Sequence, residues 1–379
     1  MGAARLNGTS RARNGAEEFD ILGTVLHASG APAPVRLPTG ATLVTTLVDS
    51  RTVLTNPSEF RLPQDVSRER LDTSAPEGPR TTPLPASEVD LGRRVFVEEL
   101  ADAARHLVDP EMDTLRFMRL PVARSTTAAL LPGADLDTRN HVAGLVLDWV
   151  DSLGPIISAA RSPRRWSGPR RAERASRTAL ADALAGQTAD PSSLAPSLAA
   201  GVQVPVAAGA WCLTQLASRT DLQHAIRADS GLALPFVWEI LRLWPPSWLL
   251  PRITSRECLV GETRLPAHAA VLVSPFALGR RPDLVPGPVE GHAPLDQIDP
   301  TRWTGSGTRP GSWLPFGAGP HACPGRNLAL AQLVHLVSWA TAYDLVSPAA
   351  PTVNTDRGLS PDPSHIRIIR RQPDDVPRA

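Results

Sequence analysis

Residues 313–343 place a loop rich in glycine and proline directly before a long apolar stretch. Gly317, Gly319 and Pro320 fall close together, so neither a regular helix nor a strand can run through the loop. The apolar residues that follow recur near helical spacing and predict one long helix. Cys323 lies just before this helix, where free N–H groups and the positive dipole end favour a thiolate over a thiol. The pattern predicts a thiolate able to bind a metal.

A buried, inert cysteine is the alternative interpretation of a single Cys on a loop. It leaves unexplained why Phe316, Gly319, His321 and Gly325 stand at fixed offsets from Cys323. Glycines at these positions would let a bulky planar cofactor approach the backbone closely.

The segment Phe316-x-x-Gly319-x-His321-x-Cys323-x-Gly325-x-x-Leu328-Ala329 resembles the haem-binding loop of the cytochrome P-450 family, with every fixed position matched. The resemblance implies a b-type haem whose iron takes the Cys323 thiolate as its proximal ligand. Such a ligand pushes electron density onto the iron. By the same resemblance, His321 reaches a haem propionate, Phe316 lies beside the sulfur, and Gly317, Gly325 and Ala329 complete the loop.

Composition excludes several other classes. The 379 residues can bury a core and enclose a cavity, and the net charge of +1 gives no electrostatic argument for binding nucleic acid or a membrane. Three cysteines form no disulfide framework and suit a reducing compartment. With no long apolar run, we expect a soluble, cytoplasmic protein. Residues 1–18 are expected to be disordered and 19–379 to form a single domain.

The remaining chain is predicted to be mainly α with a small β region, the cytochrome P-450 fold. Residues 41–48 read as a strand, and Asp49 as the N-cap of a short helix ending near residue 56. Short strands are expected within 258–275 and 351–371. Helices are expected over 88–108, 113–131, 140–153, 192–218 and 234–246.

Two regions depart from ordinary patterns. Four prolines in 71–87 forbid a regular helix. The family carries there a helix with His-x-x-x-Arg that grips a propionate, and this pair is absent, leaving Arg70 or Arg80 as substitutes. Residues 161–177 carry seven arginines. They form either a solvated face or a basic lid for an acidic partner, such as a carrier protein bearing a tethered substrate.

Residues 192–218 match the family's long central helix across the distal haem face. Ala200 and Gly201 match its motif, but Gln203 and Val204 replace the acid–alcohol pair that relays protons to bound oxygen. Val204 has no hydroxyl and Gln203 cannot ionise. Protons must then come through water, the substrate or another route; alternatively, Gln203 with an ordered water suffices. Pro205 lacks an N–H and is expected to kink the helix.

Glu239 and Arg242 stand at i, i+3 on an apolar helix and can pair. With Arg302 they match the family's structural triad behind the haem. Arg252 matches an arginine that binds a propionate. The preceding residues expected to line the substrate pocket are Ser247, Trp248, Leu249 and Leu250.

The resemblance implies a haem-thiolate monooxygenase that oxidises a hydrophobic small molecule, the expected electron donors being a ferredoxin and its reductase. Bacterial natural-product biosynthesis is the expected setting. The missing acid–alcohol pair favours coupling, rearrangement, dehydration or peroxide use. The alternative is a P-450-like partner protein without oxygenase activity that supports another enzyme, although such a scaffold has no use for a thiolate.

Overall fold

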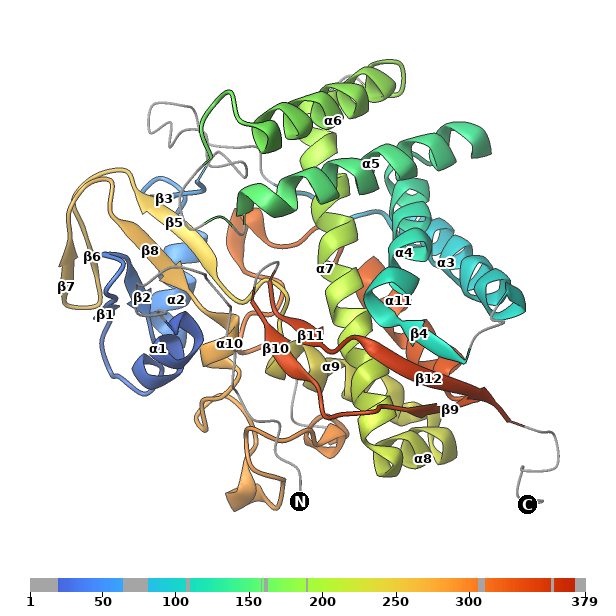
Figure 1. Cartoon of the computed structure of the whole chain (residues 1–379). Helices are drawn as coiled ribbons and strands as arrows, with labels where there is room; N and C mark the ends of the chain where they lie inside the picture. Colours follow the sequence, from blue (N-terminus) through green and yellow to red (C-terminus); the bar gives the residue numbers. More distant parts are fainter. Residues whose placement is uncertain are drawn as a thin grey trace.

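The computed structural model of the chain describes residues 20–63, 81–106, 110–157, 159, 163–188, 190–305, 311–355 and 358–371. Within these ranges the fold is mainly α with small sheets, as the sequence predicts. Long helices fill most of Figure 1, and the largest sheet lies to one side of them. The expected disordered N-terminus, Arg70 and Arg80 lie outside the described residues.

Every helix expected from apolar spacing is present, with ends shifted by a few residues. The described helices are α1 (Ile21–Ala28), α2 (Leu47–Thr55), α3 (Ala86–His106), α4 (Thr114–Leu130), α5 (Leu136–Ile157), α6 (Gly168–Ala185), α7 (Pro191–Ser218), α8 (Thr220–Ala228), α9 (Ala233–Leu243), α10 (Pro275–Leu278) and α11 (Arg326–Ala340).

The expected position of one helix start is wrong. The N-cap of α2 is Thr46 rather than Asp49, because the Thr46 hydroxyl accepts the Asp49 amide at 3.1 Å and donates to the Asp49 carboxylate at 2.7 Å. A Thr at the N-cap with an acidic residue three positions later is a reciprocal capping arrangement.

The strands form one mixed sheet and several small antiparallel ones. The largest has the order β1-β2-β8-β5-β3, in which β2 runs parallel to β8 with Thr42 opposite Val271. The C-terminal strand pairs with both β4 and β9. The strands are β1 (Val35–Arg36), β2 (Thr42–Val44), β3 (Phe60–Arg61), β4 (Glu111–Asp113), β5 (Leu250–Thr254), β6 (Cys258–Val260), β7 (Thr263–Leu265), β8 (Ala270–Val273), β9 (Tyr343–Val346), β10 (Thr352–Asn354), β11 (Ser360–Asp362) and β12 (His365–Arg370).

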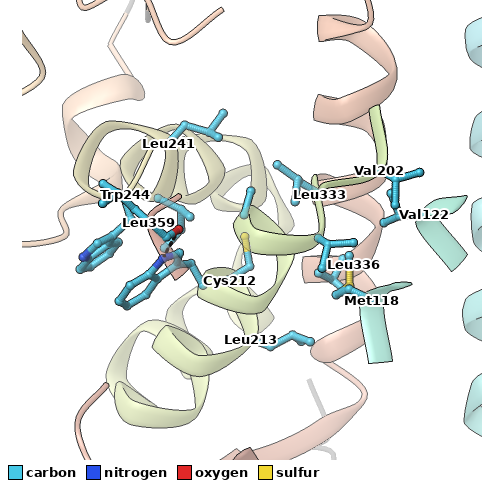
Figure 2. Close-up of a cluster of buried hydrophobic side chains, with 14 of the residues drawn as sticks. Met118, Val122, Val202, Cys212, Leu213, Leu241, Trp244, Leu333, Leu336 and Leu359 are labelled. Atoms are coloured by element: carbon cyan, nitrogen blue, oxygen red, sulfur yellow. Dashed lines mark hydrogen bonds between the residues drawn. The ribbon is translucent and has the colours of Figure 1, made fainter. Parts of the chain in front are cut away.

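Helix α7 passes through the centre of the molecule (Figure 1), and side chains from α4, α7, α9 and α11 meet in one buried cluster (Figure 2). Trp211 of α7 stacks on Trp244 at 4.4 Å between ring centroids and donates its indole N–H to the Leu359 carbonyl at 3.1 Å. The apolar residues of α7 therefore build the core of the fold.

The expectation that no segment approaches a membrane span is wrong on length and composition alone. Within the described residues, Ser193–Ser218 of α7 is long and apolar enough to cross a membrane. However, 72% of its most apolar window is buried inside the fold. Core helices of globular proteins show the same composition, because they are covered by protein on all sides.

Candidate cofactor site

The loop before α11 is a tight turn closed by its own backbone. The Cys323 amide donates to the Phe316 carbonyl at 2.9 Å, and Gly317 and Gly319 have φ of 67° and 72°. These positive φ values favour glycine. The helix begins at Arg326, later than the sequence suggests, so the turn delivers Cys323 just ahead of the first helical residue.

Gly319 is required by packing against α2. A Cβ on Gly319 would lie 2.5 Å from the Leu54 carbonyl oxygen and 2.8 Å from Thr55 Cα, both backbone atoms. A Cβ on Gly317 would meet no atom closer than 3.9 Å. The close approach at Gly319 is therefore to a neighbouring helix, an explanation that the sequence pattern did not suggest.

A second segment, 81–84, runs along the outside of the loop. The Thr81 amide donates to the Pro320 carbonyl at 2.8 Å, and its hydroxyl donates to the Ala322 carbonyl at 2.6 Å. The Leu84 amide donates to the Pro324 carbonyl at 3.1 Å. Sequence reasoning missed this strap, because nothing in the local pattern of 81–84 indicates a contact with a loop about 240 residues away.

Among the three cysteines, Cys212 and Cys258 are buried and Cys323 is half-buried. Burial raises the pKa of the Cys323 thiol, against the smaller opposing effects of the Gly325 N–H and the Arg326 charge. Without a bound cofactor, burial therefore opposes the thiolate that the helix start favours. The Gly325 N–H and the Arg326 charge lower the pKa of the thiol, but desolvation of the sulfur outweighs them, so a stable thiolate here needs a further positive charge beside it.

Apolar residues expected near the cofactor surround the loop. Phe316 packs edge-on against Trp238 of α9 at 6.0 Å between centroids. A Cβ on Gly317 would lie 3.9 Å from Leu250 Cδ1, which brings the expected pocket segment against the loop. The residues expected to line the pocket are all half-buried: Ser247, Trp248, Leu249 and Leu250. The loop residues His321, Gly325 and Ala329 are half-buried as well.

Arg252 on β5 is a buried cation. Its side chain is 4% exposed, and its Nε has no hydrogen-bond partner within the described ranges. One terminal nitrogen donates to the adjacent Pro251 carbonyl at 2.8 Å. Burial lowers the pKa of Arg252 to about 10. A buried guanidinium in this state is suited to receive an anionic group.

Helix α7 continues through Pro205 without a break in its helical backbone. Ala200 is exposed, and Gln203 and Val204 are half-buried, whereas Val202 and Val206 are buried. The first three stand at i, i+3 and i+4, so they share one face. These three residues are therefore less buried than Val202 and Val206. Gly201, half-buried, faces α4 instead: a Cβ there would lie 2.8 Å from Thr126 Cγ2.

Glu239, Arg242 and Arg302 meet in the interior with side chains 0% exposed. Arg242 forms a bidentate pair with Glu239, both contacts being 2.7 Å, and Arg302 Nε lies 3.3 Å from the same carboxylate. Trp303 Nε1 and the Asp299 amide also donate to Glu239, at 2.8 Å each. Sequence reasoning missed these two donors, although both lie close to Arg302 in the chain.

In the arginine-rich segment, some arginines pack in the interior and others lie at the surface. Arg170 is 1% exposed and donates to the Pro163 carbonyl, and Arg177 lies 3.4 Å from the buried Glu173. Trp149, a buried residue of α5, donates its indole N–H to Glu173 at 3.1 Å. At the surface, Arg165 and Arg174 both lie over the exposed ring of Trp166. Part of this cluster therefore serves the contact between α5 and α6.

A family model described as Cytochrome P450 matches residues 197–340, from α7 to the end of α11. The chain is 39% identical over 105 residues to the cyclooctat-9-en-7-ol 5-monooxygenase of Streptomyces melanosporofaciens, covering 27% of this chain and 21% of that protein. It is 42% identical over 90 residues to cyclooctatin synthase of the same organism, covering 23% and 18%. The matched part spans about a fifth of the length of these curated relatives.

Among solved structures, CYP175A1 from Thermus thermophilus is similar over 93% of this chain and 95% of its own, with a TM-score of 0.73 and 22% identity. This likeness concerns the fold alone, and it covers nearly the whole chain.

Proposed function

Because the chain belongs to the cytochrome P450 family, we propose that it is a haem-thiolate oxidoreductase that oxidises a hydrophobic small molecule. Proteins of this family bind haem through a cysteine thiolate. The observation that carries the proposal is the half-buried Cys323 on a closed turn before α11. The other two cysteines are buried elsewhere in the core.

The residues present fit a haem in two respects. The half-buried sulfur of Cys323, whose pKa is raised by burial, would be stabilised as a thiolate by a ferric iron bound to it. The buried Nε of Arg252 has no hydrogen-bond partner within the described ranges, and a haem propionate would accept a hydrogen bond from it. Cys323 would hold the iron through its sulfur, and Arg252 with His321 would hold propionates. The Glu239, Arg242 and Arg302 cluster would keep the loop's supports in place.

The bound haem supplies oxidation chemistry, and this chain's residues exclude water and position the substrate. Half-buried Trp248, Leu249 and Leu250 support an apolar pocket. Of Ala200, Gln203 and Val204 on α7, Gln203 is the residue with a polar side chain. An amide can hold a water or a substrate group but cannot transfer its own proton as an acid would. This favours atypical outcomes such as coupling, rearrangement, dehydration or peroxide use.

The two Streptomyces relatives support a setting in bacterial natural-product biosynthesis. The name of one contains a cyclic alcohol, cyclooctat-9-en-7-ol, which makes hydrophobic cyclic alcohols the first substrates to test. Electrons would come from a separate ferredoxin and its reductase, in the cytoplasm. A substrate carried on an acidic carrier protein is a further candidate, supported by the exposed arginines around Trp166.

The second candidate is a partner protein of the same fold without oxygenase activity. Val204 in place of an alcohol and Gln203 in place of an acid favour it. The two functions differ in one measurement, the absorbance of the purified protein, ferric and then reduced with carbon monoxide. A strongly red-shifted Soret band of the reduced carbon monoxide form supports the enzyme. A protein that takes up no haem when haem is supplied overturns it and leaves the partner function.

A further inference from the structure

A proline inside a helix leaves one carbonyl of that helix without its amide donor. Pro205 lies in the interior of α7 and is buried, so the Gly201 carbonyl four residues earlier receives no N–H from position 205. A carbonyl in this state at a half-buried position costs up to about 1–3 kcal/mol unless another donor satisfies it. The helix nevertheless continues without interruption to Ser218.

The substitute donor comes from another helix. The hydroxyl of Thr126 on α4 donates to the Gly201 carbonyl at 3.0 Å. Thr126 is 3% exposed, and its methyl group fills the space that a side chain at Gly201 would need. Figure 2 shows the same interface one turn away, where Val122 of α4 points toward Val202 of α7.

A buried helical threonine ordinarily bonds a carbonyl of its own helix. Thr214 of α7 does so, donating to Ala210 at 2.9 Å. Thr126 instead donates to a carbonyl of another helix, α7. The two threonines therefore form a matched pair, one bridging two helices and the other bonding only within its own.

Ser125, the residue before Thr126, contacts two other helices. The Ser125 hydroxyl donates to the Gly92 carbonyl of α3 at 2.7 Å and accepts from Gln332 Nε2 of α11 at 2.8 Å. Consecutive residues of α4 are thus bonded to α7 and to α11, the helix that follows the Cys323 turn.

We propose that Thr126 is a positioning residue that replaces the missing amide of residue 205 and fixes the backbone of α7 beside Ala200, Gln203 and Val204. Through Ser125, the same turn of α4 holds α11 at a set distance from that face. The consequence for the cofactor rests on the proposed function; the hydrogen-bond replacement does not.

A double-mutant cycle tests the replacement. Thr126→Val should raise the unfolding equilibrium constant about 5- to 150-fold, the equivalent of one carbonyl left without a donor. Pro205→Ala restores the amide at 205. In that background the same substitution should cost less than about a quarter of its original free energy. An equal loss of stability in both backgrounds overturns the proposal, because the Thr126 hydroxyl would then not replace the missing amide of residue 205.

Two further variants separate positioning from packing. Thr126→Ser keeps the hydroxyl and should recover most of the stability, whereas Thr214→Val should lose stability equally with Pro or Ala at 205. In haem-loaded protein, the C–O stretching band of the reduced carbon monoxide form reports the surroundings of the distal face. Thr126→Val should shift it and Thr126→Ser should restore it. An unmoved band in stably folded Thr126→Val overturns the effect on the distal face.

If no variant binds haem, the proposed function has failed. The unfolding cycle on the haem-free protein then decides the hydrogen-bond replacement by itself.

Discussion

The indole Nε1 of Trp303 donates to Glu239 Oε1 at 2.8 Å, in a site where the carboxylate is also contacted by two arginines. One anion thus joins α9 to the 3₁₀ turn at Pro300–Trp303. Five hydrogen bonds to a carboxylate that is 0% exposed compensate for its burial.

Glu239→Gln should destabilise the fold by about 3–5 kcal/mol, because Arg242 and Arg302 would keep buried charges without a counter-charge. Urea unfolding measures this. Glu257→Gln is the control: it removes a pair with Arg264 in which both side chains are more than half exposed, and should cost less than about 1 kcal/mol. Comparable losses in both variants would contradict the structural importance of the buried cluster.

Cys323→Ser should abolish thiolate ligation, because a serine hydroxyl does not replace the thiolate as an iron ligand. The reduced carbon monoxide spectrum should then lack its strongly red-shifted band. Cys258→Ser, at a buried position on β6, should leave the band in place. An unchanged spectrum in Cys323→Ser would mean that another residue binds the iron.

Arg252→Met should act in opposite directions on the two forms of the protein. The haem-free fold should gain or keep stability, because a buried cation is removed. Burial lowers the pKa of Arg252 to about 10. The lowered pKa means that the charge destabilises the haem-free fold below about pH 10, and that the penalty disappears as pH rises above it.

Haem-loaded Arg252→Met should lose its haem faster, since a propionate would lose its cation. Transfer of haem to an excess of an apo-globin measures the rate. Arg256→Met, at an exposed position, is the control. Unchanged haem loss in Arg252→Met would show that this guanidinium binds no propionate.

Gly319→Ala should be far more damaging than Gly317→Ala. Both positions have positive φ, and so both substitutions carry about 1–2 kcal/mol of backbone strain. Only at Gly319 would the new Cβ also collide with the backbone of α2, at 2.5 Å from the Leu54 oxygen. Thermal unfolding and haem content compare them. Equal effects would indicate that the turn moves freely away from α2.

Val204→Thr should raise the product formed per electron consumed if the missing hydroxyl limits proton delivery. Val204→Ala controls for the change in size. The measurement compares product with reductant consumed at saturating substrate. No gain in Val204→Thr over Val204→Ala would mean that water or Gln203 already delivers protons.

The fold class and most helices follow from the sequence because they depend on local spacing. The apolar run of α7 and the i, i+3 pair Glu239–Arg242 are visible in the printed chain and occur in the structure. Thr46 and Asp49 stand three apart in the printed chain, but the sequence pattern predicts the N-cap of α2 at Asp49, whereas the structure places it at Thr46.

The rest depends on contacts between distant segments. The bond from Thr126 to Gly201 joins residues 75 apart, and the strap from Thr81 to Ala322 joins residues 241 apart. No periodicity records such partners. The pKa of Cys323 escapes sequence reasoning for the same reason, because the burial that raises it comes from neighbours that the local sequence does not name.

The strap of residues 81–84 contacts the cofactor turn only through main-chain oxygens, those of Pro320, Ala322 and Pro324, in the contacts described above. These hydrogen bonds do not depend on which side chains the turn carries. Natural drift or directed evolution can therefore exchange side chains at positions such as 318 or 322 while the backbone stays tethered. A substitution in residues 81–84 can weaken the attachment instead, because proline at position 81 or 84 would remove an amide donor.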